Sequence, residues 1–456
     1  MRDVPRHFAR RVWCSAMMVP LLVGIPSAGA EDTNERGIFT EVVLREREQP
    51  LIKAAGEFEN QFSDRGYRYS DPELERWLRE IGERLQPEAT DPYIRYRFFV
   101  FRHPAPNAFA LPDGQVYVHT GMLARLENEA QLAGLLAHEI NHVAGHHGIV
   151  SYRSIRKKSL ASVIAGATLS VFLGDLGAAI SDLTNFFLLR SIYGYSRSLE
   201  QEADLRGIDL TLEAGYDARE MTRIFEILNH DPEGEQPRVK TKWSTHPQLR
   251  DRAVYLKREV GARNPTVDFA SLRVGEDEYL ARRRTVALMT VHDLIRADYR
   301  RSAVDLARAL VEEAPEDPRG LYALGEAWRA MGAEQELAGD AALKDKAKRK
   351  NLRHRELLTR DEREAQRLAS AEGRHHLAHN MEEARRVYLR AVELDPAHAE
   401  AHRGLGYANH ELGRHEQAAR ALMRYLELRP EAPDKPEILK RLQLIAGVLR
   451  RERGGS

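Results

Sequence analysis

One short stretch, LLAHEINHVAGHHG (residues 135–148), constrains this chain more than any other. It places four histidines and one glutamate within ten positions of an otherwise apolar helical pattern: His138, Glu139, His142, His146 and His147. His138 and His142 are four residues apart, so on a helix they lie one turn apart on the same face. Both imidazoles can then reach one metal ion. The stretch therefore predicts a helix that carries metal ligands.

The ends of this helix can also be predicted. Asn128 is a good N-cap, and Gln131 stands three residues later as a capping-box partner. Gly148 fits the position just past the helix. A second helix is expected from near Ser198 to Gly215, in SLEQEADLRGIDLTLEAG.

These two helices hold the groups that a zinc site needs. A zinc ion with three protein ligands keeps one position for water and lowers the pKa of that water toward about 7. Glu139 is placed to take a proton from it. Glu200 and Asp204 are again one turn apart. One carboxylate can complete a His₂Glu site while the other accepts the second N–H of a ligand histidine. Taken alone, this carboxylate pair is also typical of a solvated helix face.

The N-terminal residues 1–30 have the pattern of a secretory signal. Four arginines precede an apolar stretch at 12–25, and Ser27-Ala28-Gly29-Ala30 follows, so we expect cleavage after Ala30. The alternative is an uncleaved anchor helix, but the apolar run is short and contains Pro20 and Gly24. The single cysteine, Cys14, lies inside this segment. An exported chain without disulfides suggests a bacterial periplasm.

Charge and patterning narrow the remaining possibilities. Lys plus Arg and Asp plus Glu both number 69, which argues against nucleic acid as the main partner. Residues 93–102 alternate as a strand, and 107–123 predict a strand, a Pro-Asp-Gly turn and a second strand from Gln115 to His119. In NAFAL (107–111), Phe109 and Leu111 either pack in the core, or the segment is a sheet edge that binds an extended substrate through its main chain.

Residues 160–189 are rich in alanine, glycine and leucine. They could span a membrane, but Asp175 and Asp182 interrupt them and the uncharged run is short. We favour a pair of small-residue helices packed over the histidine-bearing helix, with a peripheral membrane or partner contact.

Past residue 280 the sequence becomes helical and repetitive. LYALGEAWRAMG (321–332) and HRGLGYANHELG (402–413) superpose, and Pro430 follows Pro396 by the 34 residues of a tetratricopeptide unit. The charged stretch 341–376 is either a degenerate repeat or an extended helical insertion. Stacked helix pairs leave a concave face that usually holds peptide segments. The alternative is a set of helical hairpins without a binding function.

Four motifs together resemble the M48 peptidases, a gluzincin-type family of zinc endopeptidases, over roughly residues 41–260. They are LLAHEINHVAGHH, NAFALPDG, EQEAD with AGYD after it, and THPQLRDR (245–252). The resemblance implies one zinc ion per chain held by His138, His142 and Glu200, with Glu139 as general base. Asp204 matches the acidic residue that ends the third motif.

The resemblance includes the fourth motif, and the chain departs from the family pattern at two positions. His246 matches a family histidine near the metal, and Arg252 the arginine that follows it. Two roles are open to His246: donor to the oxyanion, or a fourth metal ligand that holds the enzyme inactive. Pro112-Asp113-Gly114 replaces a usual Pro-Gly-Gly, and Gly145 stands where the family often has arginine. We expect His119, His146 and His147 to be surface groups or supports of the ligands.

The expected fold is α+β and mostly helical. A signal peptide (1–30) precedes a gluzincin-like metallopeptidase domain with a small β-sheet (31–275), and an all-α tetratricopeptide domain follows (276–456). We expect a periplasmic zinc endopeptidase that degrades misfolded or stalled polypeptides. The resemblance adds outer-membrane protein assembly as the setting, with the repeats docking substrate or the assembly machinery. The alternatives are a periplasmic scaffold whose metal site is vestigial or capped, and a membrane-embedded protease of the prenyl-protein type.

Overall fold

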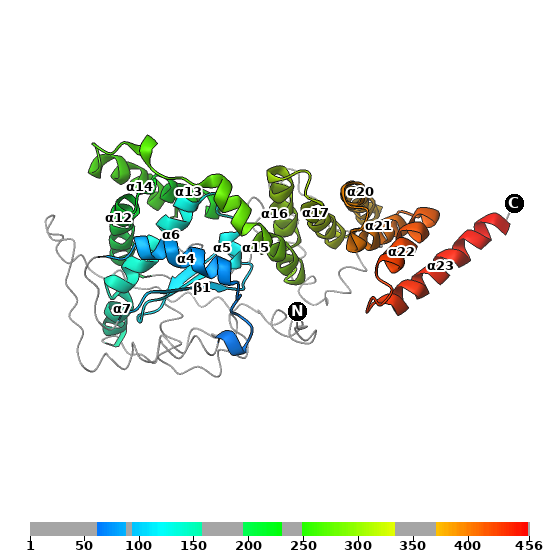
Figure 1. The fold of residues 1–456 in the computed structure, drawn as a ribbon, viewed down its shortest axis with the longest axis horizontal. Helices are drawn as coiled ribbons and strands as arrows, with labels where there is room; N and C mark the ends of the chain where they lie inside the picture. The colour runs from blue at the N-terminus through cyan, green and yellow to red at the C-terminus, as the bar shows by residue number, and fades with distance from the viewer. Residues whose placement is uncertain (1–61, 88–93, 157–194, 230–248, 333–370, 455–456) are drawn as a thin grey trace. The chain divides into compact units, whose positions relative to one another are not determined.

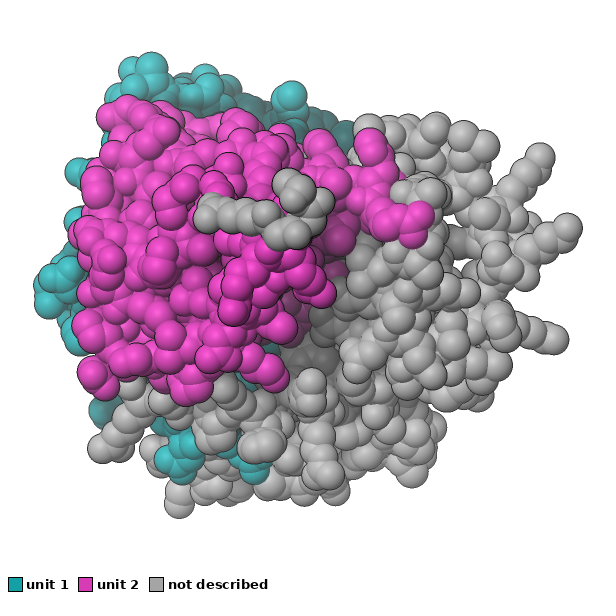
Figure 2. All heavy atoms as spheres, turned by 90° about the vertical axis from the view of Figure 1, so that its right-hand side faces the viewer, with its two compact units in different colours: residues 1–231, 237–283 teal, residues 232–236, 284–456 magenta. Residues whose placement is uncertain are grey.

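The computed structural model describes residues 62–87, 94–156, 195–229, 249–332 and 371–454 (Figure 1). The chain divides into two compact units, residues 1–231 with 237–283 and residues 232–236 with 284–456 (Figure 2). This division falls inside helix α15 (Glu276–Arg296). The signal segment 1–30, the segment 160–189 and His246 lie outside the described residues. The domain boundaries at 30 and 275 stay predictions.

The first unit contains a three-stranded sheet. Its strands are β1 (Arg97–Phe101), β2 (Ala108–Ala110) and β3 (Gln115–His119), in the spatial order β1-β3-β2. β3 runs parallel to β1 and antiparallel to β2. The expected strand and hairpin are therefore present, and β2 lies at an edge of this sheet.

The turn between β2 and β3 explains the two residues in its centre. Gly114 has a φ of 98°, and a Cβ there would lie 2.5 Å from the carbonyl oxygen of Arg95, so only glycine fits. The Asp113 carboxylate accepts hydrogen bonds from the Gln115 amide at 2.7 Å and from Arg97 at 2.9 Å. The departure from Pro-Gly-Gly thus ties the turn to both β1 and β3.

Helix α6 (Glu129–Ala144) carries the histidine motif. Asn128 caps it by accepting from the Gln131 N–H at 2.9 Å, as expected. The predicted end at Gly148 is wrong, because the helix ends at Ala144 and a new helix, α7 (His147–Arg156), begins three residues later. The left-handed residue at the break is His146, with a φ of 49°, rather than a glycine. Glycine is the usual signal for the end of a helix, so the sequence did not indicate an end at His146.

Besides the following helix α7, the helices α4 (Pro72–Arg84), α12 (Arg197–Glu213) and α13 (Glu220–Asn229) pack against α6 in the first unit. Small residues let α12 and α13 come close. A Cβ on Gly134 would lie 2.3 Å from the Met221 side chain, and one on Gly207 would lie 3.5 Å from the backbone of His138. The predicted second helix is α12, and Gly215 follows it with a φ of 81°.

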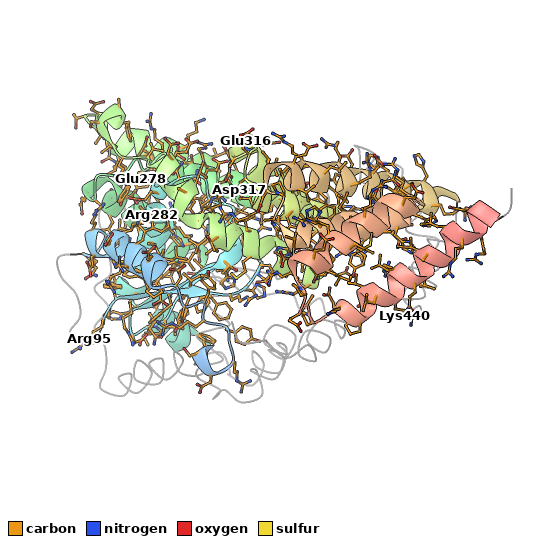
Figure 3. All side chains as sticks on the ribbon, turned by 45° about the vertical axis from the view of Figure 1, so that its right-hand side comes forward. Arg95, Glu278, Arg282, Glu316, Asp317 and Lys440 are labelled. Atoms are coloured by element: carbon orange, nitrogen blue, oxygen red, sulfur yellow. The ribbon has the colours of Figure 1, made fainter. Side chains whose placement is uncertain are left out.

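One buried carboxylate fixes the start of α6. Glu129 is 3% exposed and accepts hydrogen bonds from the Trp77 indole at 3.0 Å and the Tyr216 hydroxyl at 2.8 Å. Arg273 pairs with it at 2.9 Å. The Arg282 guanidinium, labelled in Figure 3, lies over the Trp77 ring at 5.4 Å. Segments far apart in the sequence therefore meet at the helix that carries the motif. None of the described helices has the length and apolar character that a membrane crossing requires.

The second unit is built from helices. They are α16 (Arg300–Glu313), α17 (Pro318–Met331), α20 (Ala371–Leu394), α21 (Ala399–Glu411), α22 (His415–Leu428) and α23 (Lys435–Gly454). α17 begins at the N-cap Asp317, labelled in Figure 3, whose carboxylate accepts from the Arg284 side chain at 2.6 Å. This unit confirms the expected all-α repeat region.

The helices of this unit pack in pairs. α17 packs on α20 as α21 packs on α22. The Asn380 amide of α20 donates to the carbonyl of Gly332 at 3.0 Å, and the Tyr388 ring fills the space beside Gly325. Residues 341–370 of the charged stretch lie outside the described residues, so the degenerate repeat and the extended helical insertion both stay predictions.

Candidate metal centre and active site

Three buried side chains from two helices converge in the first unit. The Nε2 atoms of His138 and His142, both on α6, lie 3.0 Å apart. The carboxylate of Glu200 on α12 lies 3.6 Å from the first of these nitrogens and 3.8 Å from the second. Within the described ranges, these residues are the one group of three or more His, Cys, Asp or Glu whose ligand atoms all lie within 4.8 Å of one another.

The geometry of this group fits a small tetrahedral cation. Two ligand atoms that are each about 2.1 Å from a tetrahedral zinc ion are about 3.4 Å from each other. The three separations of 3.0, 3.6 and 3.8 Å lie close to that value on both sides. Two imidazoles and one carboxylate are also a donor set that zinc accepts and that leaves a coordination position open. The residues present therefore fit the metal that the sequence predicted.

Asp204 supports the first ligand. Its carboxylate lies 2.9 Å from Nδ1 of His138, the nitrogen that points away from the site. Burial alone would raise the pKa of this carboxyl group, but the charge of Arg252 and the His138 ring outweigh burial, so its pKa lies well below the usual range. Asp204 therefore stays an anion that can accept a hydrogen bond from Nδ1–H of His138 and hold the His138 ring in place.

Arg252 and Tyr255, both on α14 (Leu249–Arg263), complete this network. The Arg252 guanidinium donates to both Asp204 oxygens, at 2.9 and 2.6 Å, and lies 3.1 Å from Glu200. The Tyr255 hydroxyl also donates to Asp204. Burial and the neighbouring Asp204 raise the pKa of Tyr255 far above its usual value, so it stays a donor. Sequence reasoning placed Arg252 near the motif but gave it no role, and it missed Tyr255.

The second ligand has different neighbours. Nδ1 of His142 lies 2.8 Å from Nδ1 of His147, and the Tyr195 ring stacks on His142 with the ring centroids 4.3 Å apart. The Tyr195 main-chain N–H donates to Glu200 at 3.0 Å. Tyr195 thus contacts two of the three candidate ligands. No pattern in the sequence marks it, because it stands in a short segment just before α12.

The remaining predicted residues lie as follows. Glu139 follows His138 on α6 and is 1% exposed. His119, His146 and His147 are all buried, so none of them is a surface group. Of the two expected alternatives, support of a ligand fits His147, whose Nδ1 lies 2.8 Å from Nδ1 of His142. Nδ1 of His119 lies 3.1 Å from the carbonyl oxygen of Ala105.

The NAFAL segment packs in the core and also lies at an edge of the sheet. Phe109 is 2% exposed and stacks on Tyr117, so its side chain belongs to the core. The main-chain bonds to β3 are made by Asn107 and Leu111. In an antiparallel pair, the N–H and C=O groups of the alternate residues Ala108 and Ala110 must then point away from β3. No strand among the described residues pairs with this outer edge.

The side chain of Asn107 marks the same edge. Asn107 is 0% exposed, yet neither its amide oxygen nor its amide nitrogen has a hydrogen-bond partner among the described residues. A buried amide without such partners is costly. The edge therefore offers main-chain and side-chain groups to an extended peptide.

Two histidines one turn apart, an adjacent glutamate and a second glutamate from another helix define a metallopeptidase type of site. Comparison with known proteins agrees with this: residues 72–260 match the peptidase family M48, and residues 371–434 match a tetratricopeptide repeat. The chain thus joins an M48 peptidase domain to a tetratricopeptide region.

Several curated relatives resemble the peptidase part. The beta-barrel assembly-enhancing protease of Escherichia coli K12 is 28% identical over 223 residues, and a protein of Vibrio cholerae named putative beta-barrel assembly-enhancing protease is 32% identical over 225 residues. Each match covers 48% of this chain and 45% of the relative. The mitochondrial metalloendopeptidase OMA1 of Schizosaccharomyces pombe is 34% identical over 160 residues, or 35% of this chain and 45% of that protein. The chain thus spans about half the length of the curated relatives it matches.

Proposed function

We propose that this protein is a zinc endopeptidase of the bacterial periplasm that cleaves misfolded or stalled polypeptides. The observation that carries the proposal is the convergence of His138, His142 and Glu200, all buried, with Glu139 beside them on α6. The pattern of residues 1–30 supports export. The names of the bacterial relatives support a role in outer-membrane protein assembly.

Each residue of the site has a separate role in peptide hydrolysis. A zinc ion held by the three ligands would polarise a peptide carbonyl and lower the pKa of a water molecule toward about 7. Glu139 takes a proton from the attacking water and passes it to the leaving amine. Asp204 holds the His138 ring so that its Nε2 lone pair faces the site. Arg252 offsets the negative charges of Asp204 and Glu200.

The substrate binds as an extended strand on the outer edge of β2. The free main-chain groups of Ala108 and Ala110 would pair with the peptide backbone, and the Asn107 amide would gain the partner that it lacks. This mode of binding reads the backbone rather than side chains, so cleavage needs an unfolded segment and tolerates many sequences. The tetratricopeptide region would dock the substrate or the assembly machinery on its concave face.

The function is tested with the purified chain from residue 31 to 456 and casein as an unfolded substrate. We expect proteolysis that a zinc chelator abolishes and that added zinc restores, whereas added magnesium does not, because magnesium prefers oxygen ligands. A protein that leaves casein intact with zinc bound would instead be a scaffold with a capped metal site. Cleavage that the chelator leaves unchanged would exclude the metal mechanism.

A further inference from the structure

The turn between α6 and α7 brings His147 back to the candidate metal ligand His142. His146 has a φ of 49°, a left-handed conformation that is strained for a non-glycine residue. This turn ends α6 at Ala144 and starts α7 at His147. The His147 ring therefore lies beside His142 and is 1% exposed.

Gly145 supplies the space for this ring. A Cβ on Gly145 would lie 2.4 Å from Nε2 of His147 and 2.7 Å from its Cδ2. The backbone of Gly145 has a φ of −79°, which any residue adopts, so glycine is not needed for the turn itself. The absence of a side chain at this position is explained by the ring of His147.

The contacts of His147 indicate which nitrogen of each ring carries the proton. If His142 binds a metal through Nε2, its Nδ1 carries the proton. Nδ1 of His147, 2.8 Å away, must then be the acceptor, so the proton of His147 lies on Nε2. That nitrogen faces a Glu202 oxygen at 3.6 Å, and Arg206 holds the other Glu202 oxygen at 3.2 Å.

We propose that His147 is a positioning residue for the metal ligand His142, with Gly145 making room for its ring. The proposal rests on the proposed zinc site. It makes the two histidine ligands unequal, because His138 is supported by a carboxylate and His142 by a neutral imidazole.

The charge of the site explains why an imidazole suits this position. Glu139, Glu200 and Asp204 bring three negative charges, and Arg252 brings one positive charge, all in buried positions. These side chains carry a net charge of minus two, which a bound divalent cation would neutralise. A carboxylate behind His142 would leave a net buried negative charge, which is costly, whereas a neutral acceptor adds none.

The test compares two substitutions of His147 in the full mature chain. His147→Ala removes the acceptor, and His147→Asn keeps an acceptor oxygen close to the position of Nδ1. Zinc affinity is measured by competition with a chromophoric chelator, and the visible spectrum of the cobalt-loaded protein reports on ligand geometry. We expect about 10–100-fold weaker zinc binding and an altered cobalt spectrum for His147→Ala. His147→Asn should stay within about threefold of the wild type, because its oxygen still accepts from His142.

A structural role alone would give a different pattern. The matched control is His119→Ala, which removes another buried imidazole of the same unit, one whose Nδ1 lies against the carbonyl oxygen of Ala105. It should lower the free energy of unfolding of the metal-free protein without changing zinc affinity. His147→Asn binding as weakly as His147→Ala, or His147→Ala binding as tightly as the wild type, would overturn the proposal. A wild type that binds no zinc would instead overturn the proposed function.

A double-mutant cycle tests the part played by Gly145. Gly145→Ala should weaken zinc binding in the wild type, because its Cβ pushes against the His147 ring. In the His147→Ala background the same change should have no further effect. Equal effects of Gly145→Ala in the two backgrounds would separate Gly145 from His147 and contradict the proposed coupling.

Discussion

Glu139→Gln should lower kcat for peptide hydrolysis by about a thousandfold, within the range that general bases contribute. Glutamine has nearly the same shape as glutamate but cannot accept a proton. Glu139 is not among the three converging ligands, so zinc should stay bound with the stoichiometry of the wild type. The measurements are kcat on a fluorogenic peptide and the zinc content of the same preparation.

The control for this substitution is Glu213→Gln, the same change at an exposed position of α12. It should leave both kcat and zinc content unchanged. If Glu139→Gln retained more than about a tenth of the wild-type kcat, Glu139 would not be the base, since a general base supplies at least about a hundredfold.

Arg252→Met should lower the free energy of unfolding by about 3–5 kcal/mol, which is the cost of leaving one side of a buried ion pair without its partner. The Arg252 side chain is 5% exposed and lies within 3.1 Å of both Asp204 and Glu200. Methionine fills much of the volume but leaves two buried carboxylates uncompensated. Denaturant unfolding of the metal-free protein measures the loss.

Two further variants show that the effect belongs to this site. Arg258→Met changes an arginine of the same helix whose side chain is 73% exposed, so it should change stability by less than about 0.5 kcal/mol. Arg252→Lys should fall between wild type and Arg252→Met, because an ammonium group keeps the charge but not the paired donors. A loss below about 1 kcal/mol for Arg252→Met would mean that the network does not stabilise the fold.

The sequence predicted those parts of the site that depend on local spacing. His138 and His142 follow from helical periodicity alone, because four residues make one turn. The cap of α6 at Asn128 and the hairpin turn around Gly114 are local in the same sense. The fold class followed from such elements taken together, since strands, apolar helices and a repeat each have their own period.

The other parts depend on contacts between distant segments. Glu200 and Asp204 could be an exposed pair on any helix, and only the packing of α12 on α6 brings them to the histidines. The role of Tyr195 depends on a stacking contact that no spacing encodes. For His147 the sequence left a surface position and a supporting role open, because the helix was expected to continue to Gly148; the left-handed His146 ends the helix first and brings His147 to His142.

The account depends most on His138, His142 and Glu200 holding one metal ion together. The direct measurement is the zinc content of the purified mature chain by elemental analysis, for the wild type and for Glu200→Gln after equal dialysis against a weak chelator. We predict one zinc ion per chain for the wild type and little or none for Glu200→Gln. Equal zinc content in the two proteins, or none in the wild type, would contradict the account.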